Sequence, residues 1–164
     1  MYYQSPIGTI IVNVQDEYIS EINFTDQKVE TKSAMPEKFS KKEKAILKEC
    51  TRQLDEYFSG KRKTFDFPFR QSGTLFREKV WKELTNIPYG KTISYLQLSQ
   101  RIGNEKAVRA VGTANGQNNL SIVVPCHRVI GSDGSLTGYG GGLWRKQWLL
   151  EHENKYANGV YLLF

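Results

Sequence analysis

Short apolar runs separated by turn residues occupy the first 24 residues of the chain. Their spacing predicts strands over residues 1–4, 9–14 and 18–24, and a proline and a glycine between the first two favour a tight turn. Strands so close together in the chain predict an antiparallel meander. The polar stretch 25–38 has no periodic pattern, and we interpret it as a surface loop.

A helix is predicted after this sheet. Ser40 and Glu43 have the spacing of an N-terminal capping box, and apolar residues then recur every four positions up to Gly60, a residue typical of helix ends. Cys50 lies on the apolar face of this helix, so we interpret it as a core thiol. Residues 65–69 alternate as in a strand, and the proline among them favours the edge of the sheet.

The composition changes near Gly73, and the pattern after it is helical with short turns. We therefore expect an α+β chain with two domains. Residues 1–72 form a support domain of antiparallel sheet plus helix, and residues 73–164 form a mostly helical domain. Apolar spacing predicts the first helix of this second domain over residues 76–84.

Two short helices follow in the second domain. Ser94 and Gln97 form another capping box, the helix that they open stops at Gly103, and Asn104 is suited to cap the next helix. Two short helices about a glycine turn predict a helix-turn-helix, a motif that can bind DNA. A structural hairpin of helices has the same pattern, so both interpretations stay open here.

Length and composition describe an ordinary globular protein of 164 residues, 39% of them hydrophobic and 12% aromatic. No apolar run approaches the roughly 20 residues of a membrane span, and the start of the chain has no secretory-signal pattern. We expect a protein without a membrane partner that stays in the cytoplasm, or in the nucleus of a eukaryote. Two cysteines and two histidines provide neither a disulfide framework nor a structural zinc site, so no metal is expected.

Positive charge is concentrated in the second half of the chain. Residues 1–75 hold 12 Lys and Arg against 11 Asp and Glu, a balance of +1, whereas residues 76–164 hold 11 against 6, a balance of +5. A basic excess in one region favours a nucleic-acid partner, although excess lysine also serves solubility.

Residues 122–130 contain the candidate nucleophile, Cys126, within the run Ile-Val-Val-Pro-Cys-His-Arg-Val-Ile. The aliphatic neighbours predict burial, and Pro125 fixes the backbone just before the thiol. A cysteine attacks as its thiolate, which is scarce at neutral pH for a free thiol of pKa about 8.5, so a base or a cation is needed. His127 and Arg128 are adjacent. A lone cysteine in an apolar run is more often an inert core thiol, and the run by itself does not decide between the two.

Within the second helix of the predicted helix-turn-helix, Arg109 is followed by small residues, Ala110, Gly112 and Thr113 among them. Small residues allow close helix packing. They also let a helix approach a nucleic-acid groove, with one long cation projecting from it. The pattern alone leaves both explanations open.

The order of these motifs is more specific than any one of them. Residues 74–153 resemble the O6-alkylguanine-DNA alkyltransferase family, and the opening SPIGT is similar to that family's N-terminal domain. The motifs that carry the resemblance are ISYLQL at 93–98, RAVG at 109–112, PCHRVI at 125–130, GYGGGL at 138–143 and WLLEHE at 148–153.

The resemblance implies a DNA repair protein. It would transfer the alkyl group of an O6-alkylguanine in duplex DNA irreversibly to its own cysteine, once per molecule, with the base flipped into the site; O4-alkylthymine stays open as a second substrate. No cofactor is implied, the helix-turn-helix would contact the minor groove, and we expect a monomer. A sensor of alkylated DNA and a helix-turn-helix regulator with an incidental thiol are the alternatives. The family's alkyltransferase-like relatives lack the cysteine, so Cys126 counts against the sensor.

The resemblance also implies roles for individual residues. Cys126 would accept the alkyl group, His127 would take the thiol proton through a water, and Glu153 would orient the imidazole. Without the resemblance, Glu153 would be interpreted as a solvated acid near a helix end. Tyr95 would donate to the guanine ring, and Arg109 would fill the space of the flipped nucleotide, because a base inside a paired duplex is out of reach of a thiolate.

Two positions depart from the family's pattern. Asn118 aligns with an asparagine that buttresses the turn before the cysteine, but Asn119 replaces the proline that usually follows it. Gly140 stands in the lid of the substrate pocket where the family often has serine. The complete expected sets are Cys126, His127, Glu153, Asn118 and Tyr95 for catalysis; Arg109, Ala110, Gly112, Thr113, Tyr95, Arg128 and Ser132 for DNA binding; and Tyr139, Gly140, Val129 and Pro125 for the substrate pocket.

Overall fold

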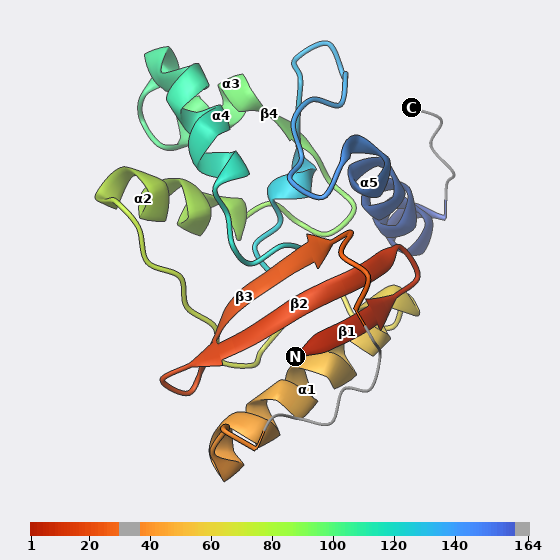
Figure 1. Ribbon diagram of the computed structural model, residues 1–164. Coiled ribbons are helices and arrows are strands. Elements are labelled where there is room, and N and C mark those ends of the chain that lie inside the picture. The colour runs from red at the N-terminus through yellow and green to blue at the C-terminus, as the bar shows by residue number, and fades with distance from the viewer. Residues whose placement is uncertain (30–36, 160–164) are drawn as a thin grey trace. The chain divides into compact units, whose positions relative to one another are not determined.

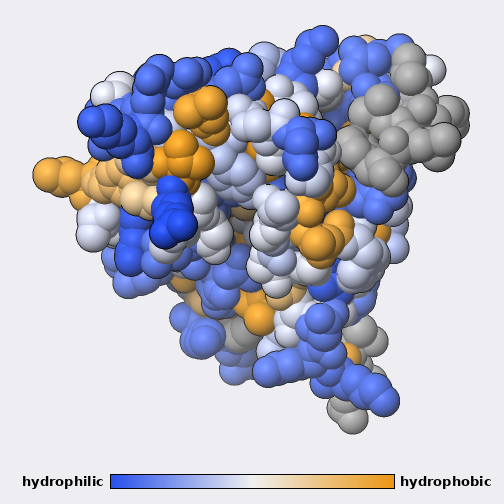
Figure 2. Space-filling model, turned by 90° about the horizontal axis from the view of Figure 1, so that it is seen from above, coloured by the Kyte–Doolittle hydropathy of each residue, from blue (hydrophilic) through white to orange (hydrophobic). Residues whose placement is uncertain are grey.

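The computed structural model describes residues 1–29 and 37–159, so part of the predicted loop at 25–38 lies outside the described residues (Figure 1). The chain divides into two compact units, Met1–Gln71 and Ser72–Phe164. The first holds a three-stranded sheet and a helix, and the second is mostly helical, which confirms the α+β class. Hydrophilic side chains cover most of the face in Figure 2, and the apolar ones form separate patches. Within the described ranges, no helix is both long and apolar enough to cross a membrane.

The sheet of the first unit is the predicted antiparallel meander, with strands β1 (Tyr2–Ser5), β2 (Gly8–Gln15) and β3 (Tyr18–Thr25) in that order. The turn between β2 and β3 consists of Asp16 and Glu17, both at positive φ, as the two-residue turns that match strand twist require. Alternate residues of β2 are buried and form one apolar face of the sheet.

Helix α1 (Lys41–Phe58) packs on the sheet of this unit. The capping box of Ser40 and Glu43 is confirmed, since each side chain accepts the other residue's backbone amide. Cys50 has no exposed surface, and burial raises the pKa of its thiol to about 12, which confirms it as a core residue.

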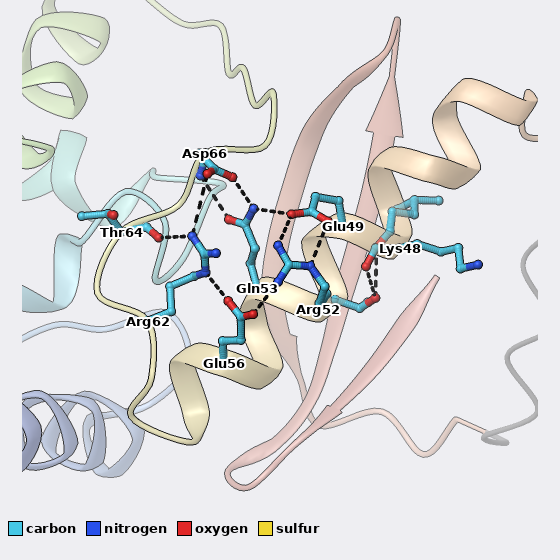
Figure 3. A network of polar contacts seen from close by, with 10 residues as sticks. Lys48, Glu49, Arg52, Gln53, Glu56, Arg62, Thr64 and Asp66 are labelled. Atoms are coloured by element: carbon cyan, nitrogen blue, oxygen red, sulfur yellow. Dashed lines mark hydrogen bonds and ion pairs between the residues drawn. The ribbon is translucent and has the colours of Figure 1, made fainter.

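The predicted edge strand at 65–69 is wrong. Only Phe69 forms a bridge, to Ile19 of β3. Pro68 has no amide to donate, and the amide of Asp66 is used elsewhere, because it donates to Oε1 of the fully buried Gln53 on α1 at 3.1 Å. Figure 3 shows the polar network around Gln53, which holds this segment against the helix in place of strand pairing.

The second unit contains four α-helices within its described residues, and they are α2 (Leu75–Leu84), α3 (Tyr95–Arg101), α4 (Val108–Gly116) and α5 (Leu143–Asn158). Helices α3 and α4 form the predicted helix-turn-helix around Gly103, whose φ is +80°. The capping box of Ser94 and Gln97 at the start of α3 is confirmed.

Asn104 does not cap α4 with its side chain, contrary to the prediction. Its carbonyl accepts the Ala107 amide at 3.1 Å, so a turn of 3-10 helix, η1 (Glu105–Ala107), comes before α4. A parallel pair of two-residue strands, β4 (Ile93–Ser94) and β5 (Val129–Ile130), was also not predicted, because two residues are too short to show a period. This pair brings the start of α3 beside the end of the cysteine segment.

Candidate active site

Cys126 lies in one turn of 3-10 helix, η2 (Cys126–Arg128), that leads into β5. The approach to this turn is strained, since the buried, β-branched Ile122 has a φ of +73°. A left-handed conformation costs such a residue about 1–2 kcal/mol and persists only where the surroundings fix it. Backbone strain of this kind is concentrated at functional sites.

Asn118 fixes the backbone of this approach. Its Nδ2 donates to the Val124 carbonyl at 2.7 Å, and its Oδ1 accepts the Leu120 amide at 3.0 Å. The same side chain hydrogen-bonds to Cys126. Asn115 of α4 adds a second tie, since its Nδ2 donates to the Cys126 carbonyl at 3.3 Å. The neighbouring Asn119 is exposed, and the contacts of Asn118 hold the turn although the following residue is not proline.

The Cys126 thiol is protonated at rest. Burial raises its pKa, while the hydrogen bond from Asn118, the charge of Lys146 and nearby backbone amides oppose that rise. The residue as a whole is 6% exposed. A thiol in this state becomes a nucleophile only when a neighbouring base takes its proton.

His127 has the position and the protonation state to act as that base. Burial lowers its pKa, Arg128 and Lys146 lower it further, and Glu153 opposes them, so the imidazole is neutral at pH 7. Its Nε2 lies 2.7 Å from Glu153 Oε1, and because an ionised carboxylate only accepts, Nε2 carries the proton. Nδ1 then presents its lone pair, and this buried atom has no hydrogen-bond partner among the described residues.

Glu153 has no exposed surface, so the interpretation as a solvated helix-end acid is wrong. Burial by itself raises the pKa of this carboxyl, but His127 and Arg128 overcome that effect and hold the pKa well below its usual range. Gly90 donates a further hydrogen bond from its amide at 3.3 Å. The carboxylate therefore stays ionised and fixes the tautomer and the orientation of His127.

Arg128 was expected among the DNA-binding residues, and this assignment is wrong. The side chain is 6% exposed, with Nε and Nη2 donating to the two oxygens of Glu153 at 2.9 Å each and Nη1 donating to the Ile87 carbonyl at 2.7 Å. Its charge is therefore already balanced inside the protein, and Arg128 keeps Glu153 ionised.

Tyr95 and Lys146 meet beside this cluster. Tyr95 is half-buried at the start of α3, and its Oη donates to the Thr137 carbonyl at 2.9 Å. The pKa of Tyr95 is raised, chiefly by burial. Lys146 has no exposed surface and donates to the Val129 carbonyl at 2.6 Å. Lys146 was not among the predicted site residues, although its spacing from Leu149 and Glu153 is that of one buried helix face.

The other expected pocket residues surround the cysteine in different ways. Tyr139 has a buried hydroxyl, and burial raises its pKa well above the usual range, against a hydrogen bond with Ser121. Val129 and Pro125 have buried side chains, so Val129 contributes to the site through its carbonyl. Gly140 is exposed, and a Cβ there would meet no atom within 4 Å.

The expected DNA-contacting residues of α4 lie mainly at the surface. Arg109, Ala110 and Thr113 are exposed, and the Thr113 hydroxyl donates back to the Arg109 carbonyl at 3.1 Å. Gly112 is half-buried because it faces Tyr95, whose ring lies 3.7 Å from where a Cβ would stand. Ser132, on a different segment, is exposed in the turn after β5.

Both units match domains of the same protein family. The profile of the 6-O-methylguanine DNA methyltransferase DNA binding domain matches residues 75–155, and that of the ribonuclease-like domain matches residues 1–71. The methylated-DNA–protein-cysteine methyltransferase of Methanosarcina acetivorans is 44% identical over 156 residues, which are 93% of this chain and 98% of that protein. The constitutive enzyme of Bacillus subtilis is 43% identical over 84% of each chain.

Solved structures agree with these matches. The crystal structure of Mycobacterium tuberculosis OGT in complex with DNA has a TM-score of 0.82 at 40% identity and covers 95% of this chain and 92% of that one. The O6-methylguanine DNA methyltransferase of Methanococcus jannaschii has a TM-score of 0.68 at 27% identity, with 100% and 98% covered. Sequence profiles, relatives and structures thus agree, and the chain belongs to the 6-O-methylguanine DNA methyltransferase family.

Proposed function

We propose that this protein repairs alkylated DNA by moving the alkyl group of O6-alkylguanine to its own Cys126. The observation that carries the proposal is the state of the two neighbouring groups. A buried, protonated thiol lies in the same 3-10 turn as a neutral imidazole whose Nδ1 has no partner among the described residues. Membership of the family supports the substrate class.

In the proposed reaction the thiol proton passes to His127 Nδ1 through a bridging water. Nε2 keeps its own proton and its hydrogen bond to Glu153. The sulfur attacks the alkyl carbon, an S–C bond forms, and the bond from that carbon to O6 breaks. Tyr95 gives its phenolic proton to the guanine ring as the base departs, and the proton on His127 later restores the phenol. Tyr95 now donates to the Thr137 carbonyl, so it must exchange that partner for the guanine.

The product is a thioether, which is a poor leaving group, so each molecule works once. This distinguishes the reaction from that of a cysteine hydrolase, whose thioester intermediate water can discharge. The alkylated protein is therefore expected to accumulate in proportion to the repaired lesions.

Binding to the duplex is proposed to use the exposed face of α4 in the minor groove. Arg109 would enter the base stack as the damaged nucleotide leaves it, with Ala110 and Thr113 along the groove and Ser132 on the turn after β5. Extrusion costs a few kcal/mol and costs least for a damaged pair, so the lesion helps to select itself. A related structure was solved in complex with DNA, which supports DNA as the partner. We further propose that residues 1–72 act as a support domain and that the protein works as a monomer.

The test is the mass of the intact protein after incubation with a duplex that carries one O6-methylguanine. A gain of one methyl group in wild type and in Cys50→Ser, and none in Cys126→Ser, is expected. Cys50→Ser is the matched control, because both variants lose one buried thiol. Binding without a mass gain would instead select a sensor of alkylated DNA. A second duplex, which carries O4-methylthymine, tests whether that lesion is also a substrate.

A further inference from the structure

Lys146 is a fully buried lysine of the second unit. It has no exposed surface, and each of its acceptors in the described part of the chain is a neutral oxygen. These acceptors are the carbonyls of Val129, Thr137 and Gly138 at 2.6, 3.0 and 3.4 Å and the Tyr95 hydroxyl at 3.5 Å. No carboxylate forms an ion pair with Lys146 within residues 1–29 and 37–159.

An ammonium in this position is costly for the resting protein. Buried lysines are rare unless they are paired with an anion, and carbonyl dipoles replace only part of the lost hydration. The one buried carboxylate of the cluster, Glu153, is already occupied by Arg128 and His127. Arg128 and Glu153 balance each other and His127 is neutral, so none of these groups balances the excess positive charge of Lys146.

That excess charge lies where negative charge must form. Removal of the thiol proton leaves a negative charge on Cys126, and proton donation to guanine leaves one on Tyr95. Lys146 Nζ is 3.5 Å from Tyr95 Oη and 5.7 Å from the centre of its ring. It also holds the carbonyl of Val129, three residues after the nucleophile.

We propose that Lys146 is a positioning residue whose ammonium is the counter-charge for the anions that form on Cys126 Sγ and Tyr95 Oη during alkyl transfer. This inference rests on the proposed function and adds a second charged group to it. The same ammonium positions the loop before α5, because Thr137 accepts from both Lys146 and Tyr95. When Tyr95 turns to the guanine, Lys146 continues to hold the Thr137 and Gly138 carbonyls.

Lys146 and Cys126 each shift the pKa of the other toward the charged form. The charge of Lys146 acts to lower the pKa of Cys126, and Cys126 acts to raise the pKa of Lys146. Burial lowers the pKa of Lys146 to about 8, so the ammonium is still protonated at pH 7. The other titratable and charged groups around the cysteine are Tyr95 from α3, His127 and Arg128 from η2, Tyr139 from the following loop, and Arg145 and Glu153 from α5.

The first experiment replaces Lys146 with methionine, which keeps the length of the stem and removes the charge. The rate of transfer from free O6-benzylguanine is measured against pH in wild type and in the variant. We expect a rate at pH 7 lower by about tenfold or more, because the opposite charge that favours the anions is missing. The rate deficit should shrink above about pH 8, where Lys146 of the wild type loses its own charge.

The matched control is Lys155→Met, the same substitution at an exposed position of the same helix, which should change neither the rate nor its pH dependence. Circular dichroism establishes that the variants are folded. A folded Lys146→Met protein whose rate deficit is the same at pH 7 and at pH 9 would make Lys146 a purely structural tie and overturn the inference. If wild type itself takes up no alkyl group, the proposed function fails instead, and the two failures are thus distinguishable.

A second measurement leaves Lys146 in place and does not depend on the folding of its variants. The ammonium of Lys146 is titrated by nitrogen NMR in wild type, and the transfer rate of the same protein is measured over the same pH range. A neutral Lys146 cannot balance the anions, so we expect the rate, divided by the fraction of thiolate, to fall as the ammonium titrates near pH 8. A normalised rate that does not change through this titration would overturn the inference.

Discussion

Replacement of Glu153 by glutamine tests how the buried cluster is held together. The change keeps the shape of the side chain and removes one negative charge. In wild type the carboxylate accepts from His127 Nε2 at 2.7 Å and from Arg128 Nε and Nη2 at 2.9 Å each. A glutamine amide has a single acceptor oxygen and no charge, so Arg128 is left buried without a counter-ion.

The expected loss of stability follows from that unpaired charge. Removal of one member of a buried ion pair costs about 3–5 kcal/mol, because the other charge remains out of water. Arg128 cannot reach solvent by a small movement, since it is 6% exposed and Nη1 is bonded to the Ile87 carbonyl. With an m-value of about 2 kcal/mol/M in urea, the unfolding midpoint should fall by about 1.5–2.5 M.

The assay is urea unfolding followed by tryptophan fluorescence, since Trp81, Trp144 and Trp148 all lie in the second unit. It is repeated at several pH values. The pKa of Glu153 is lowered by folding from its ordinary value of 4.5, so its stabilising contribution is present above that pH and is lost as pH falls through the lower folded value. The difference between wild type and the variant should be complete at pH 7 and shrink on acidification below pH 4.5.

Glu83→Gln is the matched control, because Glu83 forms a partly exposed pair with Arg101 at 3.7 Å. Pairs of that kind contribute at most about 1 kcal/mol. A midpoint for Glu153→Gln equal to that of Glu83→Gln would contradict the prediction that Arg128 is left unpaired. So would a stability difference that is the same at pH 3 as at pH 7, because it would mean that folding does not lower the pKa of Glu153.

Three further predictions concern DNA and substrate. Arg109→Ala should slow repair of a duplex about tenfold or more and leave the reaction with free O6-benzylguanine nearly unchanged; equal losses would remove the extrusion role. Gly140→Ser should fold normally, because its Cβ has open space, and should lower the ratio of benzyl to methyl transfer rates; an unchanged ratio would show that position 140 does not set substrate size. Affinity for undamaged duplex should fall about tenfold or more between about 50 and 200 mM salt, because phosphate contacts release counterions; a flat response in a filter-binding titration would contradict the basic-face argument.

Local signals in the sequence predicted most of the fold. The capping boxes at Ser40 and Ser94 and the turn at Gly103 were recognised correctly, because each depends on residues within a few positions of one another. Two predictions failed because other contacts replaced the expected ones. Residues 65–69 alternate like a strand, but Gln53 takes the amide that strand pairing needs. Asn104 is a good capping residue, but an added 3-10 turn moves the start of α4 away from it.

The site was predicted where the order of motifs resembled a family, and missed where a cation is buried. Arg128 and Lys146 have the residue type of solvated charges, and single-residue reasoning places both at the surface. Their burial depends on Glu153 and on backbone carbonyls that fold against them from other segments. In a single sequence, the residues next to Arg128 or Lys146 do not indicate a partner that comes from a distant segment.

Helix α5 nevertheless contains a usable signal. Three of its residues have no exposed surface, and they are Lys146, Leu149 and Glu153, spaced as positions i, i+3 and i+7 of one face. Lys146 and Glu153 therefore occupy positions on the helix face that packs into the core, whereas Lys155, on another face, is exposed. Burying a charge is too costly to persist without a compensating partner or a use. A charged residue at a core position of a helix is thus a stronger indication of a site than a cluster of charges at the surface. In α5 this signal selects Glu153, which orients the base, and Lys146, which is proposed to balance the thiolate.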